Sequence, residues 1–151
     1  MSAINIRQAT IADIESVAKL FDQYRQFYKQ APSVELANMF ISERIKSQES
    51  VILLAENAEE IVGFCQLYPT FCSVLAARIA VLYDLFVAEN VRKTGAGRAL
   101  MLAAQEYAKQ NNFARLDLST AKSNAPAQAL YESLGWQRDP WFYQYSLEIN
   151  Q

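Results

Sequence analysis

The stretch from residue 80 to residue 119 constrains the fold of this chain more than any other part of its sequence. AVLYDLFV, residues 80–87, is an apolar run of strand length, and the turn VRKTGAG, residues 91–97, holds two of the chain's 4 glycines. A helix with one apolar face is predicted from about Gly95 to Asn111, and ARLDLS, residues 114–119, alternates as a strand does. Strand, helix and strand in this order predict a right-handed parallel crossover, and therefore an α/β fold.

The remaining segments extend this unit into one α/β domain over residues 1–151. Alternating or apolar runs predict further strands at residues 4–9, 50–56, 61–68 and 141–149. Helical spacing predicts further helices at about residues 10–28, 33–45 and 124–134. The second and third of these strands are expected to form a hairpin. Pro69 is expected to interrupt the third strand or to mark its edge. The expected order of elements is β-α-α-β-β-β-α-β-α-β.

Composition excludes several classes of chemistry. The chain contains no histidine, so it has no Ser-His-Asp triad, no Cys-His pair and no His-ligated metal site. Acid–base chemistry must use carboxylates, tyrosine, cysteine, lysine or water. Cys65 and Cys72 lack the CxxC spacing of a zinc or redox site, and we expect no metal.

Charge and hydropathy limit the partners. The net charge is -2 and the pI is about 5.2, which disfavours a protein that binds nucleic acid through bulk electrostatics. The N-terminus has no signal-peptide pattern, and no apolar stretch is long enough to span a bilayer. We therefore expect a cytoplasmic protein without nucleic-acid or membrane partners.

The glycine-containing turn is suited to an anion. The first N–H groups of a helix have no acceptor within the helix, and the helix dipole favours negative charge there. Gly95 and Gly97 remove side chains that would block close approach. Positive charge comes from Arg92, Lys93 and Arg98. A phosphate or pyrophosphate fits these features, and so does an ordinary loop that needs glycine for its backbone geometry.

Two segments resemble the GNAT superfamily of N-acetyltransferases. RKTGAG, residues 92–97, fits the pattern Q/R-x-x-G-x-G/A of the acetyl-CoA loop in that family. NAPAQALYESLGW, residues 124–136, is similar to its segment N-x-x-A-x-x-x-Y-x-x-x-G-F/W. The order of elements also matches, so the resemblance covers essentially the whole chain. It implies the GNAT fold, with a mixed central sheet of about six to seven strands and about four helices.

A nearer likeness is to the spermidine/spermine (diamine) acetyltransferase branch of this family. IRQATIADI, IVGFCQLYPTF and YDLFV, at residues 6–14, 61–71 and 83–87, carry this likeness. That branch has one carboxylate at the position of Tyr83 and another at the position of Asp84, so this chain keeps one of the two. The difference leaves polyamine specificity open.

The resemblance implies acetyl-CoA as co-substrate and no metal. Its pyrophosphate would lie on the loop made by Arg92, Lys93, Thr94, Gly95, Ala96, Gly97 and Arg98. Its pantetheine arm would pair with the strand segment Leu85, Phe86 and Val87, where two parallel strands separate. Asn124, Ala127 and Tyr131 would complete the cofactor site. Asn124 also reads as a plain helix N-cap, and the two roles are compatible.

The resemblance also implies catalytic roles. The amine must lose a proton, and Asp84 would accept it directly or through water, or would bind a cationic substrate. A structural ion pair between Asp84 and an arginine is the alternative. Tyr83 faces the other side of the strand unless a bulge changes the alternation, and such a bulge is expected here. Tyr131 matches the family's general acid, which protonates the leaving thiolate; by position alone it would pack on its helix.

The first two helices line the acceptor cleft in this family. Candidate substrate-binding residues there, together with Asp84, are Tyr24, Phe27, Tyr28 and Glu35. The aromatic residues can form a wall for a cationic amine, and their helical spacing fits core packing equally well. A second aromatic cluster at residues 141–145 borders the site or forms part of a homodimer interface, since dimers are common in the family.

These features predict an N-acetyltransferase that uses acetyl-CoA and a primary amine in a ternary complex. A polyamine, an amino acid or an aminoglycoside-like antibiotic fits as the acceptor. A protein lysine or N-terminus, a non-catalytic sensor of acyl-CoA, and a different acyl donor remain alternatives.

Overall fold

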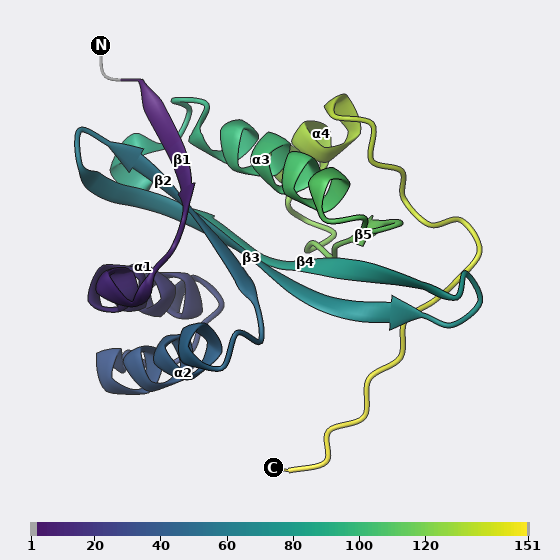
Figure 1. Ribbon diagram of the computed structural model, residues 1–151, viewed down its shortest axis with the longest axis horizontal. Helices are drawn as coiled ribbons and strands as arrows, with labels where there is room; N and C mark the ends of the chain where they lie inside the picture. Colours follow the sequence, from purple (N-terminus) through teal and green to yellow (C-terminus); the bar gives the residue numbers. More distant parts are fainter. Residues whose placement is uncertain (1–2, 151) are drawn as a thin grey trace. The chain divides into compact units, whose positions relative to one another are not determined.

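A mixed sheet of five strands lies at the centre of the first of two compact units (Figure 1). The computed structural model describes residues 3–150; the first unit ends at Ser119 and the second begins at Thr120. Strands β1 to β4 pair antiparallel in chain order, and β5 pairs parallel to β4. The strands are β1 (Ile4–Gln8), β2 (Val51–Asn57), β3 (Glu60–Cys72), β4 (Ala77–Val87) and β5 (Leu116–Asp117).

Helices cover both faces of this sheet, with α1 and α2 on one face and α3 on the other (Figure 1). The helices are η1 (Ile11–Asp13), α1 (Ile14–Phe27), α2 (Val34–Lys46), η2 (Glu89–Val91), α3 (Ala96–Gln110) and α4 (Ala125–Ser133). The side chain of Asp13 accepts the N–H of Thr10 at 2.8 Å, and the hydroxyl of Ser33 accepts the N–H of Leu36 at 3.2 Å. These polar residues start the first two helices, as predicted.

The hydrophobic core explains the apolar runs of the strands. Residues 51–55 of β2 are all buried, because helices cover both faces of the sheet. On the α1 and α2 face, the core contains Val17, Phe21, Ile41, Leu54, Phe64 and Phe86. On α3, the buried residues Leu100, Met101 and Ala104 recur at helical spacing. Full burial of one large apolar side chain contributes roughly 1.5–3 kcal/mol to stability.

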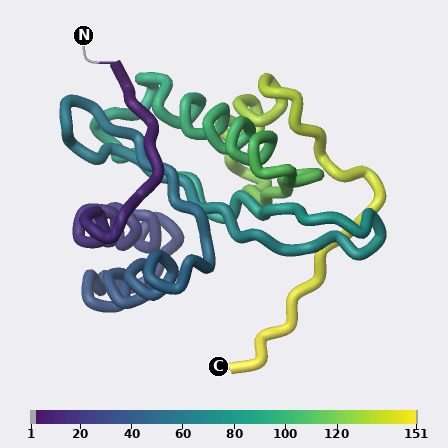
Figure 2. Tube along the Cα trace, in the orientation of Figure 1, coloured from purple at the N-terminus to yellow at the C-terminus, as the bar shows by residue number. Residues whose placement is uncertain are grey.

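Strands β3 and β4 continue as a long hairpin beyond β1 and β2 (Figure 2). β2 pairs with β3 only as far as Leu67, and β3 from Tyr68 to Cys72 pairs with β4 alone. Pro69 lies within β3 opposite Ala80, so the predicted interruption is wrong. The predicted edge is confirmed, because an unpaired side of a strand is where a residue without an N–H is tolerated.

The two final strands differ from the prediction. β5 has two residues, where the alternation predicts six, and residues 137–150 form no helix or strand. The predicted strand at 141–149 is therefore wrong, and Trp141, Tyr143 and Tyr145 are exposed. Alternation reports which side chains would share a face, but a strand also needs a neighbour to pair with. The α/β class is confirmed, with five strands in place of six to seven.

The second unit contains α4. The Asn124 side chain accepts the N–H of Ala127 at 3.2 Å and so caps the helix, and Pro126 lies in its first turn. Gly135 adopts a φ of 92°, which ends the helix where the sequence predicts. The rings of Tyr131 and Trp136 pack with their centroids 6.3 Å apart.

Cys65 is a buried free thiol and Cys72 a half-buried one. Within residues 3–150 no helix combines the length and apolar composition that a bilayer span requires. The same residues contain no group of three or more Asp, Glu, Cys or His side chains placed to bind a metal ion.

Candidate active site

A β-bulge at Tyr83 determines which side of β4 each backbone group faces. Gln66 of β3 lies opposite Asp84, and the next residue, Leu67, lies opposite Leu82, so Tyr83 is an extra residue on β4. Beyond the bulge, the N–H of Ala88 donates to the carbonyl of Val62 on β3 at 2.8 Å. Backbone groups alternate sides along a strand, so Leu85 and Val87 direct their N–H and C=O groups away from β3.

The side of β4 opposite β3 is open beyond Val81. Among the described residues, β5 pairs only with Ala80 and Val81 of β4. The backbone groups of Leu85 and Val87 therefore face an edge that no described strand covers, with the Val87 carbonyl bonded to the Arg92 side chain, and an extended ligand can pair there as a strand would. The expected separation of the two parallel strands is present in the first unit.

The loop between β4 and α3 places positive charge at a helix N-terminus. Gly95 is the N-cap of α3, with a φ of 90°, and no side chain caps the helix there. A Cβ added to Gly95 would meet nothing within 4 Å, so the loop is open at this position. Lys93 also has a positive φ, 69°, and both it and Arg98 are exposed. The first turn of α3 is accordingly open to an anionic ligand.

Two other loop residues hold this loop against the end of β4. The guanidinium of Arg92 donates from Nε to the carbonyl of Val87 at 3.0 Å and lies over the ring of Phe86 at 5.5 Å. The hydroxyl of Thr94 donates to the carbonyl of Val91 at 2.6 Å. Both contacts fix the loop backbone, which is the part that an anion would contact.

Asp84 is a buried carboxylate next to this open strand edge. Its side chain accepts a hydrogen bond from Nε2 of Gln66 at 2.9 Å, and the residue is 6% exposed. Burial raises the pKa of Asp84 above its ordinary value, and hydrogen bonds from Gln66 and Tyr24 oppose this effect. Its partners are thus an amide and a phenol, in place of the arginine of the alternative interpretation. A buried carboxylate with a raised pKa is suited to accept a proton.

Among the residues predicted to bind the acceptor substrate, Tyr24 is packed in the core and Phe27 and Tyr28 are exposed. Tyr24 is half-buried, packs edge-to-face on Phe64 and Phe86, and has its hydroxyl 3.5 Å from the carbonyl of Tyr83. Phe27 is 56% and Tyr28 48% exposed. Tyr24 therefore contributes to the core as well as to the surroundings of Asp84. The rings of Phe27 and Tyr28 pack edge-to-face on each other, and the Arg92 guanidinium lies over the Phe27 ring at 5.9 Å, so their exposed surface is partial.

Two further candidates are exposed. Glu35 lies in the first turn of α2, in solvent. Tyr83, the bulged residue, is 66% exposed and packs edge-to-face on Tyr68, with ring centroids 5.6 Å apart. The bulge changes the alternation as expected: Tyr83 packs on Tyr68, which lies on the same face of β3 as Gln66, the partner of Asp84.

In the second unit, Asn124, Ala127 and Tyr131 recur at a spacing of three and four residues on α4. The Asn124 oxygen and the Ala127 N–H bond to each other, so the Asn124 amide nitrogen is its remaining donor for a ligand. Tyr131 is half-buried beside Trp136. Their part in a cofactor site stays a prediction.

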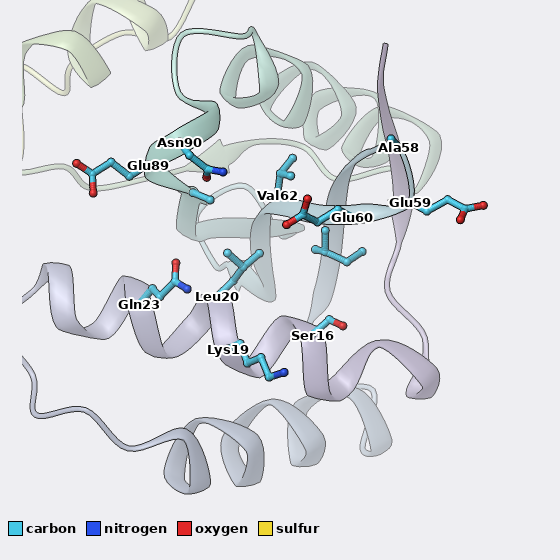
Figure 3. A pocket seen from close by; sticks show the side chains of 12 residues that line it. Ser16, Lys19, Leu20, Gln23, Ala58, Glu59, Glu60, Val62, Glu89 and Asn90 are labelled. Atoms are coloured by element: carbon cyan, nitrogen blue, oxygen red, sulfur yellow. The ribbon is translucent and has the colours of Figure 1, made fainter. Parts of the chain in front are cut away.

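A pocket of about 690 Å³ opens beside α1, the β2–β3 turn and the start of η2 (Figure 3). Lys19 and Gln23 of α1 line it together with the acidic residues Glu59, Glu60 and Glu89. None of its lining residues is among the site residues that the sequence predicts. An acidic rim alone indicates no ligand, so we assign no chemistry to this pocket.

Sequence reasoning missed Gln66. It is fully buried, and its Oε1 accepts a hydrogen bond from the Ser50 hydroxyl at 2.7 Å. The available signal was one polar side chain within the apolar run VGFCQL, residues 62–67. Such a residue must find buried hydrogen-bond partners.

Comparison with known proteins agrees with this geometry. Residues 14–136 match the family model described as "Acetyltransferase (GNAT) family". The chain is 47% identical to the uncharacterized N-acetyltransferase YhfO of Bacillus subtilis (strain 168), over 97% of this chain and 98% of that one. It is 30% identical to a probable acetyltransferase of Haemophilus influenzae, over 85% and 86% of the two chains. A crystal structure of a probable acetyltransferase superposes with a TM-score of 0.91 at 38% identity, covering 97% of this chain and 99% of the other.

Proposed function

Because this chain belongs to the GNAT family of acetyltransferases and is an N-acetyltransferase, we propose that it transfers the acetyl group of acetyl-CoA to a primary amine of a small molecule. One observation carries the proposal. Asp84, whose carboxylate is buried, directly precedes Leu85 in β4. Leu85 and Val87 direct their backbone N–H and C=O groups away from β3, towards the edge that no described strand covers. A proton acceptor therefore lies next to the place where an extended thioester arm would pair.

The family implies acetyl-CoA as co-substrate, and the loop and strand edge fit it. The pyrophosphate is assigned to the backbone of residues 92–98, where Gly95 leaves the loop open and α3 begins. The pantetheine amides are assigned to Leu85 and Val87. Asn124 and Ala127 are assigned to the cofactor from the resemblance of their segment to the family.

Asp84 is proposed as the general base. An alkylamine is mostly protonated at neutral pH and must lose a proton before it can attack a carbonyl carbon. The amine nitrogen forms a bond to the acetyl carbon, and the carbon–sulfur bond of the thioester breaks. The ammonium proton passes to Asp84, directly or through water, and the leaving thiolate takes a proton from the hydroxyl of Tyr131. The second proton that the nitrogen loses as the amide forms passes through water and restores the phenol of Tyr131.

The acceptor is proposed to be a small cationic amine. Asp84 supplies a buried negative charge, and Phe27 and Tyr28 supply exposed aromatic faces, which attract ammonium groups. Diamines and polyamines are the first candidates, because the opening strand and the central hairpin resemble the diamine acetyltransferase branch. Amino acids and aminoglycosides share the same primary amine.

A thiol-release assay tests this function. Acetyl-CoA is offered with spermidine, short diamines, amino acids, aminoglycosides and a lysine peptide, and the acetylated product is identified by mass spectrometry. We expect turnover on one small-amine class and none on the peptide. Turnover on the peptide alone would replace the small-molecule acceptor by a protein. If no amine gives thiol release while acetyl-CoA still binds in a thermal-shift control, a non-catalytic sensor of acyl-CoA is favoured.

We also propose a cytoplasmic homodimer. Both cysteines are free thiols, as is usual in a reducing compartment. Between residues 141 and 149, apolar side chains occupy every second position and are exposed in the single chain. A second copy that covered them would remove this apolar surface from water. Sedimentation should give the dimer mass for the wild type and the monomer mass for a variant with Tyr143→Ser and Tyr145→Ser.

A further inference from the structure

Asp84 belongs to a short series of three polar side chains inside the first unit. The Ser50 hydroxyl donates to Oε1 of Gln66 at 2.7 Å, and Nε2 of Gln66 donates to Oδ2 of Asp84 at 2.9 Å. Gln66 is 0% exposed. Ser50 is half-buried and directly precedes β2. The series therefore connects three segments that are distant in sequence.

The bulge of β4 brings this series into register. Gln66 and Asp84 are directly opposite each other on β3 and β4, and the register changes at the next residue pair. Residues directly opposite each other on neighbouring strands have adjacent side chains on one face of the sheet. The extra residue Tyr83 thus leaves Asp84 opposite the amide donor and places Leu67 opposite Leu82.

The Asp84 carboxylate selects the orientation of the Gln66 amide, and the Ser50 hydroxyl binds its other end. An ionised carboxylate only accepts hydrogen bonds, so the NH₂ group of the amide must face Asp84. The amide oxygen then faces Ser50, whose hydroxyl donates to it. A rotated amide would place its oxygen against a carboxylate oxygen, and the carboxylate would lose its donor, whereas the Ser50 hydroxyl can pair with either end of the amide.

We infer that Gln66 is a positioning residue for Asp84, and that Ser50 holds the other end of the Gln66 amide. This inference rests on the proposed function, in which Asp84 is the base. The amide binds one carboxylate oxygen and so holds the carboxylate in one orientation, with its remaining acceptor positions available to Tyr24 and to the substrate ammonium. A hydrogen bond to the ionised form also favours that form, which is the form that accepts a proton.

Other titratable groups face Asp84 from two packed elements. Tyr24 comes from α1 and Tyr68 from β3, while Cys65 directly precedes Gln66 and so lies on the other face of β3. Burial raises the pKa of each of these three groups, in the case of Cys65 to about 12. Arg44 and Glu49 also act on Tyr68. Because these phenols and this thiol remain neutral at physiological pH, they do not contribute to the acid limb of the pH profile.

The substitution Gln66→Met tests the inference, since it keeps a side chain of similar length and removes the donor. Without the donor the pKa of Asp84 rises, so the base is protonated over a wider range of pH. The acid limb of kcat/KM should move up by about one pH unit. Activity should fall about tenfold on the acid side and return towards the wild-type level at high pH. Ser50→Ala should move the limb in the same direction by less.

The control is Leu67→Met, a volume-conserving change at the neighbouring buried position, which should leave the acid limb in place. A direct titration of the Asp84 carboxyl by carbon NMR in Ser50→Ala needs no acceptor and leaves the strand side chains intact. Suppose that Asp84→Asn abolishes activity, but that Ser50→Ala and Gln66→Met change neither the Asp84 pKa nor the acid limb. That result would overturn the positioning role of Gln66 and would leave Asp84 as the general base. Wild-type activity in Asp84→Asn would instead overturn the assignment of Asp84 as the general base.

Discussion

The loop at residues 92–98 and the region around Asp84 differ in the sign and the burial of their charged side chains. The loop presents exposed cations and the start of a helix, and its geometry comes from glycine and from contacts of Arg92 and Thr94 with the backbone. Asp84 is a single buried anion held by side chains from β3 and α1. The loop therefore suits an anionic ligand, whereas the buried carboxylate of Asp84 suits proton transfer.

This difference predicts which substitutions affect binding and which affect chemistry. A change at the loop should weaken cofactor binding and leave the base unaltered. A change at Asp84 should lower turnover and leave cofactor affinity unaltered. The predictions that follow test this division, in order of decreasing effect.

Asp84→Asn should have the largest effect on turnover. The amide cannot accept the proton, and loss of a general base costs typically 10²–10⁴-fold, so we expect kcat/KM to fall by at least about 100-fold. Acetyl-CoA affinity by calorimetry should stay within about twofold, because the cofactor is assigned to backbone groups. Asp13→Asn is the matched control, since it changes another buried aspartate far along the chain. Equal loss in both variants would mean that Asp84 acts through stability.

Tyr131→Phe should have a smaller effect. A thiol has a pKa near 8.5, so a thiolate leaves with little assistance, and we expect kcat to fall by about tenfold with unchanged acetyl-CoA affinity. Steady-state kinetics across pH would measure this. If kcat equals that of the wild type at every pH, Tyr131 does not donate the proton.

Asp13→Asn should affect stability and not turnover. Asp13 accepts from the Arg7 guanidinium at 2.7 Å, and this contact lowers the pKa of Asp13 to about 2. Because the folded pKa lies below the unfolded one, the carboxylate stabilises the fold above about pH 4 and this contribution is lost as the pH falls towards 2.

Chemical denaturation should accordingly show the variant about 1–3 kcal/mol less stable at pH 7. The difference between the two proteins should shrink below pH 4. A constant difference down to pH 2 would contradict the assigned cause.

The local structure of the segments to which the cofactor is assigned was largely predictable from sequence. Gly95 was predicted at the start of α3, and its left-handed backbone is what makes glycine suitable there. The helix that follows Asn124 and ends at Gly135 was predicted as well, because caps are local signals. Such features depend on residues close together in the chain.

The rest depended on contacts between distant segments. In the sequence alone, Gln66 is an isolated polar residue. Its position opposite Asp84 follows only from the pairing of β3 with β4. The position of the bulge at Tyr83 likewise follows from pairing across the hairpin. The alternation at residues 141–149 predicted a strand, but alternation does not supply a pairing partner.

Calorimetric titration of acetyl-CoA into the wild type, Gly97→Ala and Gly97→Glu tests the central claim most directly. The family pattern permits alanine at this position, so Gly97→Ala should bind nearly as the wild type does. Glu at the second residue of α3 favours the helix but brings a negative side chain to the assigned pyrophosphate, so we expect affinity to fall by about 100-fold while the melting temperature is maintained. Equal affinity in all three proteins would contradict the assignment of acetyl-CoA to this loop.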